Sequence, residues 1–297
     1  MSLVEELKQV LFRPRRKLHQ FIAVNVFVFF VIKLVFVFET LFKLPSNFST
    51  KIIEYLSIPA SFDILIKQPW SVFTYMFLHK DFFHLLFNML GLYWFGQLLE
   101  EYLGGKKFSL IYIFGGLVGG LLFIAVYNLF PVFENVVAQS RTVGASAGVL
   151  AIAVATATLL PDHQFMLLFL GLVKIKYLVL FFVLIDLINI TGDNAGGHIA
   201  HLGGAIIGFV YIKQLRKGRD VSSPFQSFFR FFTKLFKRKP KLKVTYRNPA
   251  NDKKNVKKQL DKQEIIDRIL DKISKYGYEG LTKEEKDILF RASQEKE

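Results

Sequence analysis

Three groups of polar residues interrupt otherwise apolar stretches of the sequence, and their side chains suit hydrolytic chemistry. His84 and Asn88 are four positions apart, so a helix would carry both on one face. Ser146 is flanked by alanines and glycines, and His198 and His201 are one helical turn apart. Because polar groups are costly inside a bilayer, residues of this kind within apolar stretches are candidates for a functional site.

A serine and a histidine brought together can perform nucleophilic catalysis. The hydroxyl becomes a nucleophile when a neighbouring base takes its proton, and histidine is the commonest such base. His84 and Asn88 offer donors for the oxyanion of a tetrahedral intermediate, together with a backbone amide near Ser146. Taken alone, a serine within a helix more often bonds to a carbonyl one turn earlier. The hypothesis therefore depends on the coincidence of the three groups.

The composition indicates a membrane protein with a basic tail. Of the 297 residues, 52% are apolar and 21% are charged, and the formal net charge is +15. The lysines and arginines crowd the segment after Arg216, which favours positive-inside topology and attraction to anionic lipid at the cytoplasmic face. Nucleic acid is not an expected partner, because no known binding module accompanies the charge. The absence of cysteine excludes disulfides, thiolate catalysis and Cys-ligated metals.

Six apolar segments can cross a bilayer, which takes about 20 residues, or fewer when one end lies below the surface. The distribution of lysine and arginine between the connecting segments places both termini in the cytoplasm. That orientation, assigned without the candidate residues, directs all three polar groups toward the outer face. The apolar run 165–173 is ambiguous between an interfacial segment and an extension of the fifth helix. The six segments are 21–38, 82–98, 109–127, 146–160, 177–188 and 198–215.

The charge and hydropathy patterns divide the chain into four parts. A cytoplasmic N-terminal segment (1–20) precedes a six-helix membrane domain (21–215), a basic juxtamembrane segment and linker (216–258) and a C-terminal helical hairpin (259–297). Within the third part, residues 224–241 alternate phenylalanines with lysines and arginines, which predicts an interfacial amphipathic helix. In the hairpin, Thr282 and Glu285 predict a capping box at the start of the second helix.

Five short motifs follow one another along the chain: 70–78 (WSVFTYMFL), 84–89 (HLLFNM), 96–100 (GQLLE), 144–146 (GAS) and 200–205 (AHLGGA). Together they resemble the rhomboid family of intramembrane serine proteases, and the resemblance covers roughly residues 72–215. The sequence departs from the family where Ser71 replaces a common arginine and where Ala147 replaces a common glycine, and neither change is expected to affect catalysis.

The resemblance implies an all-α polytopic membrane protein, a six-transmembrane-helix rhomboid bundle to which this chain adds a small cytoplasmic helical hairpin. It also implies a Ser–His dyad without a catalytic aspartate, with Ser146 as nucleophile and His201 as base. His201 is favoured over His198 because Gly204 and Gly208 follow it by three and seven residues, as the family pattern requires.

The remaining roles follow from the same resemblance. His84 and Asn88 would bind the oxyanion, His198 and Gly144 would lie beside the site or line its cavity, and Glu100 would be a structural acid. Transmembrane proteins would be the substrates, no cofactor or metal is expected, and the location would be a bacterial inner membrane.

Four alternative functions compete with this interpretation. Residues 144–148 fit the G-x-S-x-G motif of α/β-hydrolases, with Asp186 between Ser146 and His201, but the flanking strand–turn–helix pattern is missing. Asp186 is therefore expected to be a polar residue near the outer end of the fifth span. The metalloprotease motif H-E-x-x-H is absent, and His198 with His201 has no evident third ligand. A transporter would show internal repeats, which are not found. A rhomboid-like pseudoprotease that binds transmembrane helices without cutting them is the main non-enzymatic alternative.

Overall fold

The computed structural model describes residues 17–44, 48–167, 171–219 and 249–294. The chain forms two compact units, Met1–Leu235 and Phe236–Glu297. Within the described residues, the first unit is mainly a bundle of helices, and the second is a helical hairpin.

The first helix of the described residues, α2 (Lys17–Leu41), is apolar along its length and turns many large side chains outward. Phe27, Phe30 and Leu34 are all more than half exposed, as expected for a surface that contacts lipid. Its start is held by the buried carboxylate of Glu100, which accepts hydrogen bonds from the peptide N–H groups of Lys17 and Leu18. A carboxylate at this end of a helix satisfies free N–H groups and interacts favourably with the helix dipole.

Two groups of short elements, within residues 48–77 and 131–142, come together and form a small folded cap. The strands β1 and β2 pair antiparallel, with Ile58 opposite Thr142. The guanidinium of Arg141 donates to the carbonyl of Glu54 and to the side chain of Gln68, which ties the two ends of this cap together. The elements are α3 (Phe48–Leu56), β1 (Ile58–Pro59), α4 (Phe62–Lys67), α5 (Ser71–Thr74), η1 (Tyr75–Phe77), η2 (Pro131–Val136) and β2 (Arg141–Thr142).

The longest element, α6 (Phe82–Leu129), consists of two helices joined at a break. Gly104 has φ +77° and ψ 159°, a conformation that is open to glycine and strained for other residues. The predicted spans 82–98 and 109–127 lie on either side of this glycine. The first half begins at Asp81, whose carboxylate accepts a hydrogen bond from the N–H of His84 at 2.9 Å.

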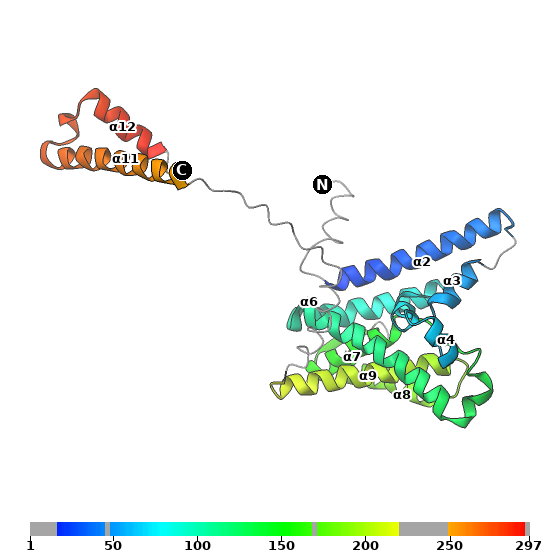
Figure 1. Ribbon diagram of the computed structural model, residues 1–297. Coiled ribbons are helices and arrows are strands. Elements are labelled where there is room, and N and C mark those ends of the chain that lie inside the picture. The colour runs from blue at the N-terminus through cyan, green and yellow to red at the C-terminus, as the bar shows by residue number, and fades with distance from the viewer. Residues whose placement is uncertain (1–16, 45–47, 168–170, 220–248, 295–297) are drawn as a thin grey trace. The chain divides into compact units, whose positions relative to one another are not determined.

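The core of the bundle is formed where α6, α7 (Ser146–Leu159) and α9 (Ala195–Arg216) pack together (Figure 1). Nine of the 14 residues of α7 are buried, and they are mostly alanine and glycine. A methyl group added at Gly204 or Gly208 of α9 would overlap the carbonyl oxygen of Ala147 or Ala151 of α7. Since no hydrophobic effect drives helices together in lipid, such close backbone contact is an important source of stability.

Each of the six apolar segments predicted from the sequence coincides with a helix or with half of α6. Three helices in the described part of the chain are long and apolar enough to cross a membrane: α2, α6 and α9. The shorter helices α7 and α8 (Ile175–Ile188) each have 14 residues. α8 packs against α7 and α9 and exposes most of its side chains.

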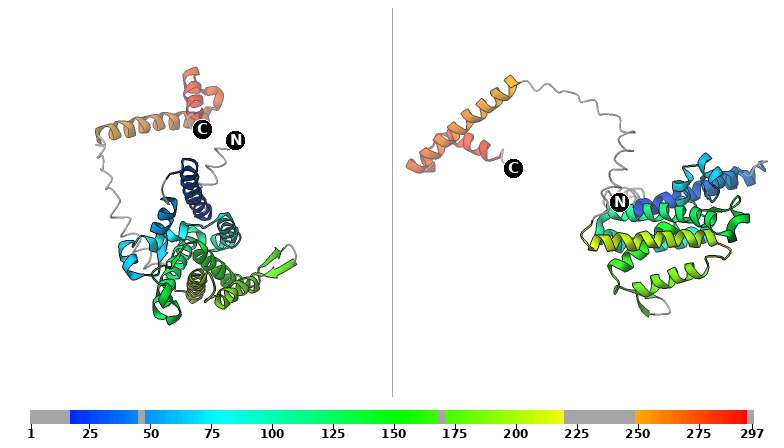
Figure 2. Two further views of the ribbon diagram at one scale, coloured as in Figure 1. Left: turned by 90° about the vertical axis from the view of Figure 1, so that its right-hand side faces the viewer. Right: turned by 60° about the horizontal axis from the view of Figure 1, so that its bottom comes forward.

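The run 165–173 is not part of the fifth helix, which was one of the two interpretations that its sequence allows. It lies in an antiparallel hairpin of β3 (Gln164–Leu167) and β4 (Gly171–Lys174), which projects from the side of the bundle (Figure 2). Asp162 accepts hydrogen bonds from Lys176 and Lys174 at the base of this hairpin, and these bonds lower the pKa of its carboxyl to about 2. The helix begins at Ile175, after the hairpin, so the run does not lengthen it.

The second unit is formed by α11 (Pro249–Tyr276), η3 (Tyr278–Gly280) and α12 (Lys283–Gln294). The capping box is confirmed: Glu285 accepts from the N–H of Thr282, and Thr282 Oγ1 accepts from the N–H of Glu285. The predicted linker was placed too far along the chain, because α11 already begins at Pro249. The predicted amphipathic helix 224–241 lies outside the described residues.

The α7–α9 contact predicts a cost for even the smallest added side chain. Replacing Gly208 with alanine should lower the stability of the bundle by about 1–3 kcal/mol, because the methyl group meets backbone that cannot rotate away. The measurement is the thermal midpoint of the purified protein in detergent. Ile206→Val, on the exposed side of the same helix, is the matched control and should leave the midpoint unchanged. Equal midpoints for Gly208→Ala and wild type would contradict the proposed importance of this contact.

Candidate active site

Ser146 is the first residue of α7, so its hydroxyl lies at the positive end of a helix. The first helical hydrogen bond is donated by Val149 to the carbonyl of Ala145, and the N–H groups of the preceding turn point away from the helix body. Gly144 supports this arrangement with φ +141°, and its N–H donates to the carbonyl of Tyr75. A Cβ at Gly144 would lie 3.0 Å from His84 Nε2 and 3.2 Å from Ser146 Oγ. The glycine therefore keeps space open beside the hydroxyl.

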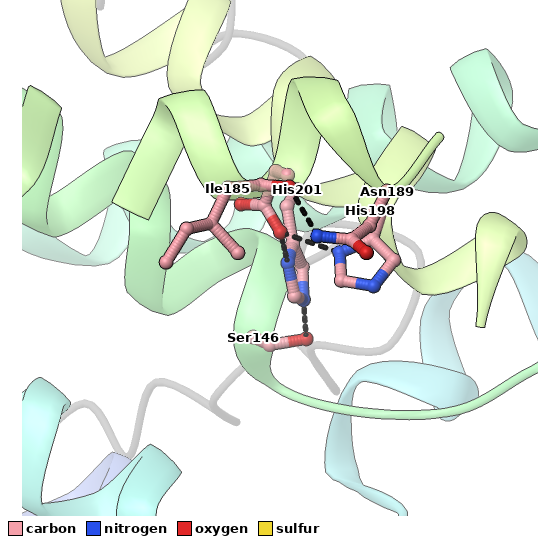
Figure 3. A network of polar contacts seen from close by, with 6 residues as sticks. Ser146, Ile185, Asn189, His198 and His201 are labelled. Carbon is pink, nitrogen blue, oxygen red and sulfur yellow. Dashed lines mark hydrogen bonds and ion pairs between the residues drawn. The ribbon is translucent and has the colours of Figure 1, made fainter. Parts of the chain in front are cut away.

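The structure brings His201 of α9 to this hydroxyl. The Nε2 atom of His201 lies 2.6 Å from Ser146 Oγ, a hydrogen-bond distance (Figure 3). Gly204, one turn further along α9, permits the approach because it packs directly on the backbone of Ala147. The two residues are 55 positions apart in the chain, so the contact depends wholly on how α7 and α9 pack.

A third residue, Asp186 of α8, completes a chain of hydrogen bonds. Its Oδ1 atom lies 2.8 Å from Nδ1 of His201 and 2.7 Å from Nδ1 of His198. If each Nδ1–H donates to the carboxylate, Nε2 of His201 presents a lone pair to Ser146. The sequence analysis treats Asp186 only as a polar residue near a helix end. Its position was nevertheless a sequence signal for a functional residue, because Asp186 is a carboxylate within an apolar helix and such residues are commonly functional.

His84 and Asn88 face the same cavity from the first half of α6. Nδ1 of His84 accepts a hydrogen bond from the N–H of Lys80 at 3.3 Å, so Nε2 carries the proton and can donate. That Nε2 faces Gly144, because a Cβ built on Gly144 would lie close to both this atom and Ser146 Oγ. Asn88 uses one of its amide hydrogens on the carbonyl of His84, at 2.8 Å, and retains a second.

His79, which the sequence analysis did not single out, packs against the ring of His84. It is buried, and its ring packs edge-on against that of His84 with centroids 5.1 Å apart. Burial, together with the neighbouring His84, lowers the pKa of His79 to about 3, so its imidazole is neutral at physiological pH. A neutral ring can fill this position without the cost of a buried charge.

These groups open onto a cavity of about 650 Å³ with mainly apolar walls. Its walls come from the first half of α6, from α7 and α8, and from Leu167 of β3 and the start of α9. Phe87, Trp94, Phe95 and Phe182 contribute aromatic rings, so the cavity suits an apolar chain that presents one polar bond to Ser146. Glu100 is not among the lining residues, in keeping with its structural contact to α2.

Asp186, His198 and His201 are also the types of residue that hold metal ions. Their ligand atoms lie within 4.8 Å of one another. The separations of 2.7 and 2.8 Å between oxygen and nitrogen are those of direct hydrogen bonds. Two ligands of one tetrahedral zinc ion would be about 3.3 Å apart, given zinc–ligand distances near 2.0–2.1 Å. The arrangement is therefore that of a hydrogen-bonded cluster.

Comparison with known families agrees with the resemblance seen in the sequence. Residues 67–218 match the Rhomboid domain, about half of the chain, and the protein belongs to the rhomboid family. Residues 250–295, which include most of α11 and α12, match a family of unknown function, DUF6576.

Individual relatives are distant. The chain is 31% identical to RHOMBOID-like protein 12, mitochondrial, of Arabidopsis thaliana, over 50% of its own length and 47% of that protein. It is 28% identical to the presenilin-associated rhomboid-like protein, mitochondrial, of Bos taurus, over 64% and 46%. It is also 28% identical to the putative rhomboid protease YdcA of Bacillus subtilis, over 34% and 50%. The chain thus spans about half the length of these relatives or less.

The space at Gly144 predicts the effect of one methyl group. We expect Gly144→Ala to slow labelling of Ser146 by a small fluorophosphonate by at least about tenfold, because the added carbon contacts both His84 and Ser146. Gly171→Ala is the matched control, since Gly171 also has a positive φ (+70°) but an added carbon there has no neighbour within 4 Å. Equal slowing in both variants would show general strain in place of a local effect at the site.

Proposed function

We propose that this protein is a serine endopeptidase that hydrolyses peptide bonds in or near transmembrane segments of other membrane proteins. The observation that carries the proposal is the hydrogen bond between Ser146 Oγ and His201 Nε2 at the wall of an apolar cavity. Membership of the rhomboid family supports it, as does similarity to a protein named a putative rhomboid protease.

The proposed chemistry proceeds through an acyl-enzyme. Ser146 Oγ attacks the scissile carbonyl carbon while His201 Nε2 takes the hydroxyl proton. The tetrahedral intermediate collapses, the C–N bond breaks, and the protonated His201 gives its proton to the leaving amine. Water then attacks the ester with His201 again as base, which releases the second product and restores the hydroxyl. No cofactor takes part in this sequence.

His84 and Asn88 are proposed to stabilise the oxyanion. The Nε2–H of His84 and the second amide hydrogen of Asn88 are available donors in the cavity, and the N–H groups at the start of α7 are further candidates. Losing one such donor typically costs about 2.7–4 kcal/mol of transition-state stabilisation. His198 is not proposed as the base, because its Nδ1 atom contacts Asp186 and not Ser146.

We further propose six spans: α2, the two halves of α6, α7, α8 and α9. The lysine and arginine distribution favours cytoplasmic termini, a cytoplasmic hairpin and contact between the basic tail and anionic lipid. The expected location in a bacterial inner membrane is not supported by the comparisons, because the relatives from Arabidopsis thaliana and Bos taurus are mitochondrial by name.

The decisive experiment is cleavage of a transmembrane reporter by purified protein in detergent. Wild type should cut, and Ser146→Ala and His201→Ala should each lose at least about a thousandfold in rate, because nucleophile and base act as a unit. His198→Ala removes a histidine of the same helix that contacts Asp186 and not Ser146, so it should keep most of the cleavage that the other two variants lose.

Other outcomes have distinct meanings. Cleavage by all four proteins alike would identify a contaminant. No cleavage and no fluorophosphonate labelling, with the reporter still bound, would favour the alternative, a pseudoprotease that holds transmembrane helices.

A further inference from the structure

We infer that Asp186 is a positioning residue of the active site, which orients His201 and thereby makes this site a Ser–His–Asp arrangement. The inference rests on the proposed function. It departs from the dyad without aspartate that the family resemblance implies, and its evidence is the set of hydrogen bonds among Asp186, His201 and Ser146 in this chain.

The first argument is geometric. Asp186 Oδ1 lies 2.8 Å from His201 Nδ1. His201 Nε2, on the opposite side of the same ring, lies 2.6 Å from Ser146 Oγ (Figure 3). A carboxylate on Nδ1 selects the tautomer whose Nε2 is a bare acceptor. It also stabilises the imidazolium that forms when the serine proton is taken. In the other tautomer Nε2 would carry a hydrogen and could not take that proton.

The second argument comes from burial along α8. Three of its 14 residues are buried, and Ile175 and Val179 accompany Asp186 in that set. An ordinary amphipathic or lipid-facing helix would not bury its carboxylate, because an ionised group out of water is costly unless it is hydrogen-bonded. Here the carboxylate is 6% exposed and receives two histidine donors. α8 thus buries a charge at the one place where it contacts the candidate base.

His198 has a defined part in this arrangement. Its Nδ1 shares the same carboxylate oxygen at 2.7 Å, and its ring is nearly perpendicular to that of His201, with centroids 5.9 Å apart. It therefore supplies Asp186 with a second donor and restricts the rotation of the carboxylate. Because Asp186 lies on α8 while both histidines lie on α9, the orientation of His201 depends on α8 remaining packed against α9.

The test uses the full-length protein in detergent and two readouts. The first is the rate at which a small fluorophosphonate labels Ser146, which reports on the nucleophile without a transmembrane substrate. The second is the kcat and KM for a transmembrane reporter. The variants are Asp186→Asn, Asp186→Glu and the control Asn189→Ala. Asn189 is also a polar residue near the end of α8, and its side-chain amide donates to the carbonyl of Ile185 in the same helix.

We expect Asp186→Asn to lower kcat and the labelling rate by about 10²–10⁴-fold with KM within about twofold, the behaviour of a residue that acts through the base. Asp186→Glu should recover at least about tenfold over the asparagine variant, since it restores the charge. Asn189→Ala should match wild type. If Asp186→Asn is misfolded by size-exclusion chromatography, the glutamate variant decides, because a carboxylate displaced by one methylene should still slow labelling.

Three results would overturn the inference while leaving the proposed protease intact. One is labelling of Asp186→Asn at the wild-type rate. Another is a raised KM with unchanged kcat, which would assign Asp186 to substrate access. The third is loss of wild-type activity on metal chelation, which would assign the cluster to a bound ion. A wild type that neither cuts nor is labelled would instead count against the proposed function itself.

Discussion

The backbone contact between α7 and α9 is the constraint on which the site depends. Gly204 and Gly208 lie against the carbonyl groups of Ala147 and Ala151, closer than any residue with a side chain would permit. That approach places His201, one turn before Gly204, within hydrogen-bond distance of Ser146, which begins α7. The same small residues that pack the bundle therefore set the distance between Ser146 and His201, the proposed nucleophile and base. In a bilayer, where helices gain little from burying apolar surface, this contact contributes both stability and geometry.

The remaining elements support this contact from either side. The first half of α6 supplies His84 and Asn88 along one wall of the cavity, and Tyr75 holds the backbone of Gly144 through its carbonyl group. α8 supplies the opposite wall and the carboxylate of Asp186. The polar atoms are thus concentrated at one place in an apolar cavity, where a low dielectric strengthens each hydrogen bond. A substrate chain would gain contact with the aromatic rings and reach the polar groups only at the bond beside Ser146.

Three features of the structure do not follow from the local sequence pattern. The run 165–173 is apolar enough for a helix, but β3 pairs with β4 across a short connection and the segment becomes a hairpin. Asp186 was correctly placed near the end of a helix, yet its partners are 12 and 15 residues away on another helix. Residues 249–258 are strongly polar, which suggested a linker, and they form the start of α11. In each case the local pattern was compatible with more than one structure.

The sequence by itself determined the helical segments, the break between the two halves of α6 and the polar residues within them, because hydropathy and small-residue spacing are local properties. It also determined the family, since the motifs around Ser146 and His201 must coincide along one chain. Only the tertiary structure decided which nitrogen of His201 meets Ser146, that Asp186 takes the other, and that His198 shares this carboxylate. Those contacts arise from how α7, α8 and α9 pack, and distances between separate helices are not encoded in the spacing along any one of them.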